Sequence, residues 1–270
     1  MPYNLLKGKK GIVFGALDER SIAWITAIKC KEEGAELILS NAPVALRMGE
    51  INKLAEQVGA PVIPCDVSNG EDVDNLITRS MEHFGGGFDF ILHSIGMSVN
   101  VRKGKHYTEI DYTNNIKTLE ISSMSLHRVL AACMKKDALN DWGSVIALTY
   151  IAAQRVFPDY NEMADAKSLL ESVARSFGYH YGVKKHVRIN TISQSPTNTS
   201  AGSGVGGFDS FFAYAEKMSP LGNASAEDCA QFTTLLFSDM TRMVTMQNLF
   251  HDGGFSSSGI TDSLIEKLNK

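Results

Sequence analysis

The stretch KGIVFGALDERSIAWITAIKCKEEGAELILS, residues 10–40, decides the fold. It begins with Lys10–Phe14, a short apolar run followed by glycine, which is typical of a buried strand. Residues 21–33 then have a helical pattern, and residues 36–39 form a second apolar run. A strand, a helix and a second strand in this order predict a βαβ unit.

The same alternation continues along the rest of the chain and predicts an α/β fold: a Rossmann-type, doubly wound parallel sheet of about seven strands with helices on both faces. No internal repeat, charge block or low-complexity linker divides residues 1–270, so we expect a single domain. Its ligand is expected beyond the carboxyl ends of the strands. The further strands are expected at residues 61–64, 88–93, 143–150, 187–192 and 246–251, and the further helices at residues 48–57, 70–84, within 112–134, after Pro158, 208–217 and 226–238.

Composition limits the classes of partner. Of the 270 residues, 21% are charged and 44% hydrophobic, and the net charge of -4 argues against nucleic acid as the main partner. The seven histidines are scattered, so no metal site is expected. The N-terminus lacks an apolar signal region and no stretch approaches the roughly 18 apolar residues of a membrane span, which predicts a cytoplasmic protein without membrane attachment. The cysteines are too far apart for a disulfide framework or a zinc site: Cys30, Cys65, Cys133 and Cys229.

The segment TYIAAQRVFPDYNEMADAK, residues 149–167, carries the strongest indication of chemistry. Tyr160, Met163 and Lys167 lie at positions i, i+3 and i+7 of the helix predicted after Pro158, and so share one face. A lysine ammonium near a phenol lowers the pKa of that phenol and makes it a better acid toward an oxygen that gains charge. The alternative is a surface tyrosine and lysine that have no joint role.

Other polar and small residues follow the predicted strands. Gly15 opens a turn into the helix that starts near Ser21, where a pyrophosphate meets helix N-terminal amides, although a plain turn is the alternative because the G-x-G-x-x-G pattern is incomplete. Asp66 either accepts from an adenine amino group or caps a helix. Residues 94–96 let the backbone approach a ribose closely, and His93 is expected to be a core histidine.

Two further segments bear on the ligand. The second strand ends in Ser40-Asn-Ala-Pro43, with neither the acidic residue that commonly binds an NAD ribose nor an adjacent arginine for a 2′-phosphate; Arg47 is the nearest cation. The loop 193–207 is rich in Gly, Ser and Thr and precedes the aromatic segment 208–218. We expect a lid over an apolar ligand here, with a plain surface loop as the alternative.

Together these motifs closely resemble the NAD(P)H-dependent enoyl-acyl-carrier-protein reductases of bacterial fatty acid synthesis, in the short-chain dehydrogenase/reductase superfamily. The resemblance runs from about Gly8 to Phe255. Its most specific part is the spacing Tyr160-x6-Lys167, because ordinary short-chain dehydrogenases have three residues between the tyrosine and the lysine. The other matching motifs are Gly15-x5-Ser21-Ile22, Asp66-Val67, His93-Ser-Ile-Gly96, Ile192-Ser-Gln-Ser-Pro196 and Asp252-Gly-Gly-Phe255.

The resemblance implies hydride transfer from NADH, with NADPH less favoured, to the β-carbon of a trans-2-enoyl thioester on an acyl carrier protein. It implies three catalytic residues: Tyr160 donates to the enolate oxygen, Lys167 holds the nicotinamide ribose and Tyr150 lines the acyl pocket. The substrate contacts that it implies are Ser98, Tyr150, Tyr160, Met163 and Phe208. The implied cofactor contacts are Gly15, Ser21, Ile22, Ala42, Asp66, Val67, Ser94, Ile95, Gly96, Lys167, Thr197, Asn198, Thr199, Ser200 and Ala201.

The resemblance also implies a homotetramer packed through the apolar helix within residues 112–134, and a substrate lid at about 197–218. Basic residues that some relatives carry beside the lid phenylalanine are absent around Phe208, so an acidic carrier protein is expected to meet other cations, with Lys217 and Arg155 ahead of Lys103 and Lys105.

Two other functions compete with this one. A short-chain dehydrogenase acting on a carbonyl or an alcohol would keep the cofactor, and the spacing between Tyr160 and Lys167 distinguishes the two. A nucleotide-binding scaffold without catalysis would be expected to lack one of these residues.

Overall fold

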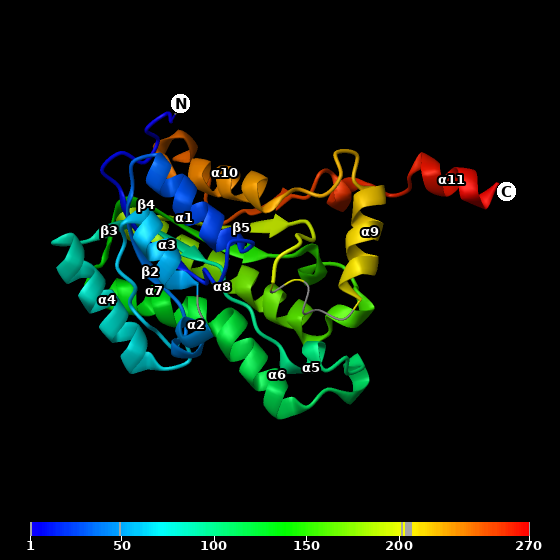
Figure 1. Cartoon of the computed structure of the whole chain (residues 1–270), viewed down its shortest axis with the longest axis horizontal. Coiled ribbons are helices and arrows are strands. Elements are labelled where there is room, and N and C mark those ends of the chain that lie inside the picture. Colours follow the sequence, from blue (N-terminus) through cyan, green and yellow to red (C-terminus); the bar gives the residue numbers. More distant parts are fainter. Residues whose placement is uncertain (1, 49, 201, 203–206, 270) are drawn as a thin grey trace.

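The computed structural model describes residues 2–48, 50–200, 202 and 207–269, and its centre is a parallel sheet (Figure 1). Within the described residues the sheet has six strands in the order β2-β1-β3-β4-β5-β6, so the predicted Rossmann-type α/β class is confirmed. The strands are β1 Lys10–Phe14, β2 Glu36–Ser40, β3 Phe88–His93, β4 Leu139–Thr149, β5 Arg188–Gln194 and β6 Asn248–His251. The helices are α1 Ile22–Glu32, α2 Pro43–Met48, α3 Ile51–Val58, α4 Gly70–Phe84, α5 Val99–Arg102, α6 Tyr112–Leu119, α7 Ser125–Lys136, α8 Glu162–Lys185, α9 Phe208–Met218, α10 Ala226–Phe237 and α11 Asp262–Leu268.

The seventh strand, expected at residues 61–64, is reduced to a single bridge between Val62 and Leu39. The segment runs beside β2, and Ile63 N donates to the Leu39 carbonyl at 2.9 Å. Pro61 has no N–H, so the ladder lacks a donor where it would begin. This edge of the sheet therefore carries an extended segment with fewer backbone bonds than a full strand.

Two of the predicted helices differ in their bounds. The helix expected at residues 48–57 is α3, which begins at Ile51, and the preceding α2 at Pro43–Met48 was not expected. The long helix expected within residues 112–134 consists of α6, a π-helical segment at Glu120–Met124 and α7. A π-helical turn inserts one residue into the helical repeat and so redirects the side chains that follow it. The apolar periodicity of the sequence does not reveal this insertion.

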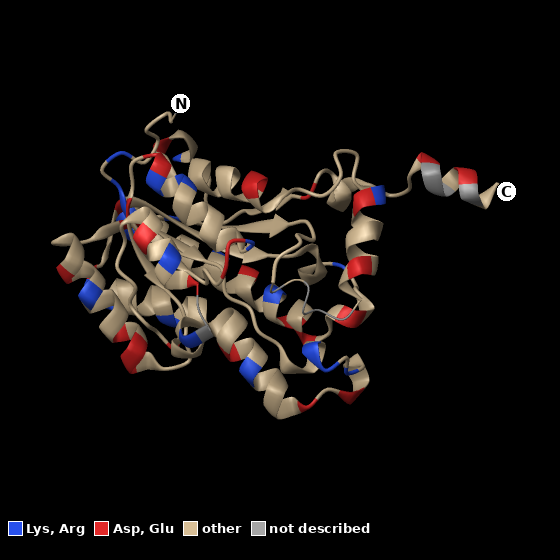
Figure 2. Ribbon diagram, in the orientation of Figure 1, with Lys and Arg blue, Asp and Glu red and all other residues tan. Residues whose placement is uncertain are grey.

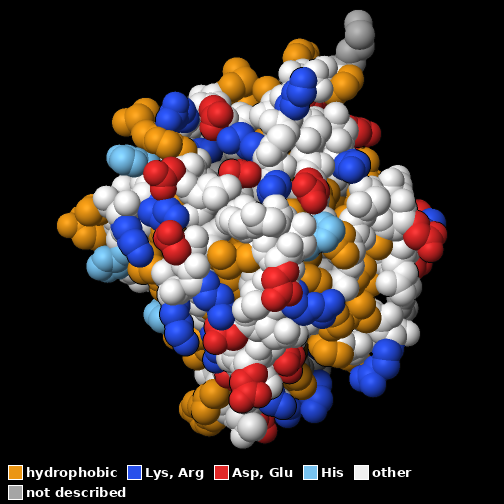
Figure 3. All heavy atoms as spheres, turned by 90° about the vertical axis from the view of Figure 1, so that its left-hand side faces the viewer, with side chains coloured by type: hydrophobic (Ala, Val, Ile, Leu, Met, Phe, Trp, Pro, Cys, Tyr) orange, Lys and Arg blue, Asp and Glu red, His pale blue; other side chains and the backbone are white. Residues whose placement is uncertain are grey.

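Charge is spread unevenly over the surface. On the face shown in Figure 3, basic and acidic side chains are interspersed, with apolar side chains between them. Figure 2 shows a basic segment at α5 and in the loop that follows it, where Arg102, Lys103 and Lys105 are all exposed. In this second region three basic residues lie within four positions of the chain.

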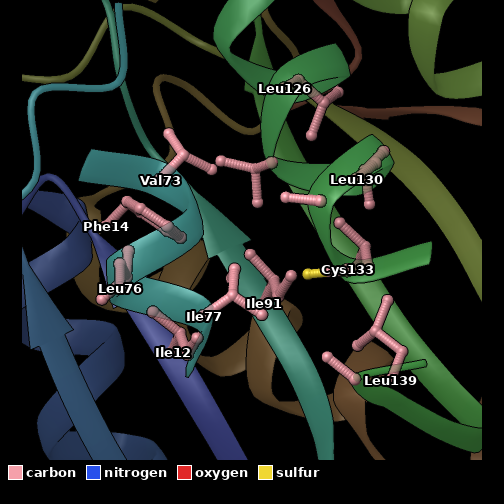
Figure 4. Close-up of a cluster of buried hydrophobic side chains, with 14 of the residues drawn as sticks. Ile12, Phe14, Val73, Leu76, Ile77, Ile91, Leu126, Leu130, Cys133 and Leu139 are labelled. Carbon is pink, nitrogen blue, oxygen red and sulfur yellow. The ribbon is translucent and has the colours of Figure 1, made fainter. Parts of the chain in front are cut away.

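Both faces of the sheet are covered by apolar helices. Strand residues alternate between the faces, so that Ile12 and Phe14 point to the side of α4, α7 and α8, whereas Val13 points to the side of α1, α3 and α10. Figure 4 shows the first of these cores, where Leu76 and Ile77 of α4 and Leu130 of α7 meet the strand residues. Because the strands are buried on both faces, their sequences are continuous apolar runs. The four cysteines are free and buried, as expected.

A glycine in β1 makes room for an aromatic ring of the neighbouring strand. Gly11 is the register partner of Phe90, and a methyl group added at Gly11 would overlap the Phe90 ring, which also stacks on Phe237 at 4.5 Å. We expect Gly11→Ala to lower the free energy of unfolding by about 1–3 kcal/mol in urea titrations, since the buried ring has to move.

The matched control is Gly182→Ala in α8, where an added methyl group meets no atom within 4 Å and should leave stability equal or slightly higher. Pairing Gly11→Ala with Phe90→Leu should cost less than the sum of the single changes. Additive costs would show that the ring is not what the glycine accommodates.

Candidate active site

The loops after β1 and β3 approach each other so closely that only glycine fits between them. Gly15 has φ +92, and a side chain on it would overlap the carbonyl oxygen of Ser94. Such a conformation is readily available to glycine alone. The contact brings Gly15 and Ser94, both predicted cofactor residues, to one point at the carboxyl edge of the sheet, where ligands of doubly wound folds bind.

The N-terminus of α1 lies beside this point and is built to face an anion. Ser21 is the N-cap, and its hydroxyl accepts from Trp24 N at 3.3 Å and donates to the Asp18 carbonyl at 2.8 Å. Ile22 is the first residue of the helix. Free N–H groups and the helix dipole make such a terminus a phosphate site. Ser21 is thus the helix cap that was predicted; because its hydroxyl hydrogen is already donated to Asp18, its contact with a phosphate stays a prediction.

Asn41 organises the end of β2, a role that the sequence did not suggest. Its side-chain amide donates to the Ala16 carbonyl at 2.8 Å, and its Oδ1 accepts from Ala42 N at 2.8 Å. The amide therefore ties the β2 end, with the predicted contact Ala42, to the turn after Gly15. The only available signal was a polar residue directly after a buried strand.

Asp66 and Val67 follow the edge segment. The Asp66 carboxylate accepts from both the backbone N and the hydroxyl of Ser68, at 2.9 and 2.6 Å, and Asn69 is the N-cap of α4. The alternative of Asp66 as the helix cap is therefore wrong. Val67 is nearly buried, and its carbonyl accepts from Arg128 at 2.6 Å.

Lys167 is a buried cation at the same edge of the sheet. Its side chain is 7% exposed and its ammonium donates to the Leu148 carbonyl at 2.8 Å. Burial lowers the pKa of Lys167 to about 8, and the negative charge of Glu171 opposes this shift. Gly96 lies directly over it, since a methyl group there would be 3.8 Å from the ammonium and 3.4 Å from the Met163 methyl.

Tyr160 is not on the helix that carries Lys167, so the predicted shared helical face is wrong. Tyr160 ends a 3-10 turn at Pro158–Tyr160, Asn161 adopts φ 43 and ψ -137, and α8 begins at Glu162. The predicted lowering of the Tyr160 pKa is also wrong: burial raises it. The phenol therefore stays protonated at neutral pH and is available as a hydrogen-bond donor.

An aromatic cluster surrounds the two tyrosines. The Tyr150 ring centroid lies 5.1 Å from that of Tyr160 and 5.1 Å from that of Phe157. Phe157 meets Phe211 of α9 edge-on at 5.7 Å and also contacts Phe255. The Tyr150 hydroxyl is buried and has no hydrogen-bond partner among the described residues, and burial raises its pKa.

The lid helix meets the cluster through Phe211. Phe208 pairs with Phe212 along α9 at 5.9 Å, and its contact with the substrate stays a prediction. Neither Phe157 nor Phe211 was predicted as a site residue. The sequence signals were weak: an apolar residue before Pro158, and an aromatic residue one turn after Phe208.

Serines in and after the π-helical segment fix the loop after β3. Ser122 accepts from Met97 N at 3.0 Å, and Ser123 donates to the Ala166 carbonyl of α8 at 2.7 Å. Ser125 lies 2.8 Å from Nε2 of His93. His93 is fully buried, and burial, followed by the charge of Lys167, lowers its pKa to about 3, so it is the predicted core histidine. The Met97 bond positions the loop of Ile95 and Ser98.

The loop after β5 reaches back to the N-terminus of α1. Ser200 lies 2.6 Å from the Arg20 guanidinium and is also hydrogen-bonded to Asp18. Thr199 is nearly buried and accepts from Gly202 N at 3.0 Å, Thr197 donates to the Ser195 carbonyl at 2.9 Å, and Asn198 is exposed. Ala201 lies outside the described residues.

Across the described ranges, no group of three or more His, Cys, Asp or Glu side chains is placed to hold a metal ion. The same ranges contain no helix that is long and apolar enough to cross a membrane.

A parallel α/β sheet with a glycine cradle, a capped helix terminus and a tyrosine with a buried lysine at its carboxyl edge defines a dinucleotide-dependent reductase of the short-chain class. Residues 15–256 match the family described as "Enoyl-(Acyl carrier protein) reductase". The chain belongs to this family and is an oxidoreductase.

Its relatives match it along most of their length. The enoyl-[acyl-carrier-protein] reductase [NADH] FabI of Rickettsia bellii is 34% identical over 262 residues, covering 96% of this chain and 98% of that protein. The Bacillus subtilis enzyme of the same name is 30% identical and covers 93% and 96%. The crystal structure of the FabI-NADH complex from Alistipes finegoldii is 62% identical, with a TM-score of 0.95 and coverage of 96% and 92%.

The lowered pKa of Lys167 predicts an alkaline limit to activity. The folded protein loses the proton near pH 8, so kcat/KM should fall above about pH 8 as the ammonium becomes neutral. In the Lys167→Arg variant, the pH at which kcat/KM begins to fall should rise by more than about one unit, because a guanidinium stays charged. This shift is measured on the activity that the variant retains.

The same shift makes a prediction for stability. The unfolded chain binds the Lys167 proton more tightly than the folded one, so this group should make unfolding less favourable as the pH rises from about 8 to about 10.5. Urea titrations that show the opposite trend for wild type relative to Lys167→Arg would contradict the assignment of the buried proton.

Proposed function

We propose that the chain reduces trans-2-enoyl-acyl-carrier-protein thioesters with NADH in bacterial type II fatty acid synthesis. The observation that carries the proposal is the joint position of Tyr150, Tyr160 and the buried Lys167 at the carboxyl edge of the sheet. The spacing of Tyr160 and Lys167 supports a reductase of enoyl thioesters over a dehydrogenase of alcohols. The family and the NADH named for its relatives support the same reaction.

The residues present fit a dinucleotide. Gly15 lets the loops after β1 and β3 approach each other without a side chain between them, and the capped N-terminus of α1 is proposed to face the pyrophosphate. Lys167 supplies a donor for ribose hydroxyls. When bound, the cofactor supplies the hydride. The remaining residues proposed to contact it are Ser21, Ile22, Ala42, Asp66, Val67, Ser94, Ile95, Gly96, Thr197, Asn198, Thr199, Ser200 and Ala201.

The chain's own contribution is to stabilise charge on the thioester oxygen. Tyr160 is protonated at neutral pH, as a phenol ordinarily is, and burial raises its pKa further, so it donates a hydrogen bond to that oxygen as charge develops there. Lys167 adds a positive charge in a dry environment, where its field is screened little. Tyr150, whose buried hydroxyl has no hydrogen-bond partner among the described residues, is proposed to line the acyl pocket with Ser98 and Met163.

The end of β2 supports NADH over NADPH. Asn41 and Ala42 offer no positive charge to a 2′-phosphate, and the nearest cation in the sequence, Arg47, is exposed. The relative from Alistipes finegoldii was crystallised with NADH. We therefore propose a preference for NADH with modest discrimination.

The proposal is tested by following NADH and NADPH oxidation with a crotonyl thioester. Tyr160→Phe should lower kcat by about two orders of magnitude while the Kd for NADH changes little, since one donor to the developing charge is lost. Lys167→Ala should weaken both turnover and NADH binding. Unchanged turnover in both variants would contradict these roles, and faster turnover of NADPH would contradict the cofactor preference.

The lid is proposed at about residues 197–218, within a single reductase domain of residues 1–270. Its helix α9 covers the aromatic cluster through Phe211, and its first residues are joined to Asp18 and Arg20. A segment that contacts both the acyl pocket and the phosphate turn is well placed to close over both ligands.

The acidic carrier protein is proposed to dock on the basic segment after α5. Arg102, Lys103 and Lys105 are exposed, and none of them forms an ion pair in the described part of the chain. The segment lies close to catalysis, because the Lys105 carbonyl accepts from the side chain of Asn161, next to Tyr160. Lys217 and Arg155 are exposed too, but Lys217 follows the acidic Glu216.

Charge reversal distinguishes docking from chemistry. Lys103→Glu with Lys105→Glu should raise KM for a carrier-protein thioester by about tenfold at low salt, because like charges then oppose association, and added salt should reduce the effect. The KM for a crotonyl pantetheine thioester should not change. The control of equal charge is Lys7→Glu with Lys31→Glu, two exposed lysines near the start of β1 and the end of α1. An equal effect on both substrates would place the docking surface elsewhere.

The chain is further proposed to be a cytoplasmic homotetramer. Large apolar side chains are exposed on α6 and α8: Tyr112 and Ile116 are 77% and 67% exposed, and Tyr179 and Val183 are 61% and 72% exposed. Exposed apolar side chains at this density on helices that contact each other support burial against further copies of the chain.

A further inference from the structure

Glu162 is a fully buried carboxyl group two residues after Tyr160, and the reaction as described does not use it. Its Oε1 accepts from the Ser98 hydroxyl at 2.5 Å. Thr118 Oγ1 lies 3.2 Å from the same oxygen and 2.9 Å from the Asn114 carbonyl, so its single hydrogen is shared between two acceptors. The second oxygen, Oε2, is buried without a partner among the described residues.

Burying a carboxyl group with one unpartnered oxygen is energetically unfavourable, so packing alone is a poor reason for a glutamate at this position. Removing such a group from water costs several kcal/mol before compensation. The first turn of α8 and the Ser98 hydroxyl offset part of this cost through the helix dipole and one hydrogen bond. Asp165 also lies in this first turn, but it is exposed and bears no such cost. Packing and helix capping therefore do not account for Glu162.

The backbone between the catalytic tyrosine and Glu162 is strained. Asn161 has φ 43 and ψ -137, a strained conformation that residues other than glycine rarely adopt. The residue is buried, and its side-chain amide donates to the Lys105 carbonyl. A strained residue persists only where its surroundings hold it, and here Asn161 is held from one side by the loop after α5 and from the other by the Glu162 contacts.

Those contacts join three elements that meet the substrate site. Ser98 follows β3, caps α5 by accepting from Val101 N at 3.0 Å, and is the donor to Glu162. Thr118 belongs to α6. Glu162 opens α8, directly after the turn that carries Tyr160. One carboxyl group therefore fixes the loop after β3 and α6 against the catalytic turn.

We propose that Glu162 is a positioning residue: through Ser98 and the strained Asn161 it holds the Tyr160 phenol where the thioester oxygen gains charge. The proposal rests on the proposed reduction of enoyl thioesters. Its effect is on kcat, because a small displacement of a donor weakens its bond to the developing charge far more than it weakens NADH binding.

The test compares Glu162→Leu, Glu162→Gln and Asp165→Asn, using kcat and KM for a crotonyl thioester, the Kd for NADH by fluorescence, and Tm. Glu162→Leu should lower kcat about tenfold to a hundredfold with the Kd for NADH within about twofold. Glu162→Gln keeps an acceptor for Ser98 and should remain within about threefold of wild type. Asp165→Asn removes an equal charge from the same helix turn and should leave all four values unchanged.

Wild-type kcat in Glu162→Leu would overturn the proposal, as would equal losses in Glu162→Leu and Glu162→Gln, or a loss of kcat matched by an equal loss of NADH affinity. Should Glu162→Leu not fold, Asn161→Gly carries the test: glycine relieves the strain and should lower kcat several-fold at unchanged NADH affinity, and wild-type kcat there would overturn the proposal. A wild-type chain that does not reduce the thioester would instead contradict the proposed function.

Discussion

The buried charge of Lys167 is the constraint on which the site depends. An ammonium group with 7% exposure is tolerated only where polar groups surround it, and here the Leu148 carbonyl at the end of β4 accepts its hydrogen bond. Glu171, one turn along α8, supplies a negative charge and is itself held by Thr149 and Asn248, at 3.0 and 3.2 Å. The network ties α8 to β4 and β6, so the helix can move little relative to the sheet without exposing an unpaired charge.

The loops after β1 and β3 approach each other because their strands are neighbours in the sheet. Parallel strands bring Gly15 and Ser94 to one level, because β1 and β3 are neighbours in register. The Ser94 carbonyl approaches Gly15 so closely that any side chain at this position would overlap it. Asn41 extends this arrangement to β2, and the Ser122 bond to Met97 extends it to the loop after β3. The proposed cofactor and acyl sites are therefore adjacent, because the loops that carry them begin on neighbouring strands.

Sequence periodicity predicted the layers well because each strand is buried on both faces and each helix pattern is long. It failed where one residue decides the backbone. Pro61 removes a ladder donor, and the positive φ of Asn161 separates Tyr160 from α8, and neither leaves a mark in hydrophobic spacing. The spacing of Tyr160 and Lys167 identified the chemistry, but the sign of the Tyr160 pKa shift depends on burial, which only the fold reveals. Residue spacing cannot predict contacts between segments that are distant in the sequence, such as those of Phe157 with Phe211 and of Ser98 with Glu162.

The raised pKa of Tyr160 changes how the site is to be understood. A phenolate would repel an oxygen that gains negative charge, whereas a protonated phenol stabilises it, so burial favours the catalytic form of the tyrosine without any help from Lys167. Lys167 is then free to act through its charge and its hydrogen bonds, at the cost of a pKa lowered toward neutrality. Both consequences come from excluding water. Burial disfavours the charged form of both groups, so it lowers the pKa of Lys167 and raises the pKa of Tyr160, whose ring lies against the aromatic cluster of Tyr150, Phe157 and Phe211.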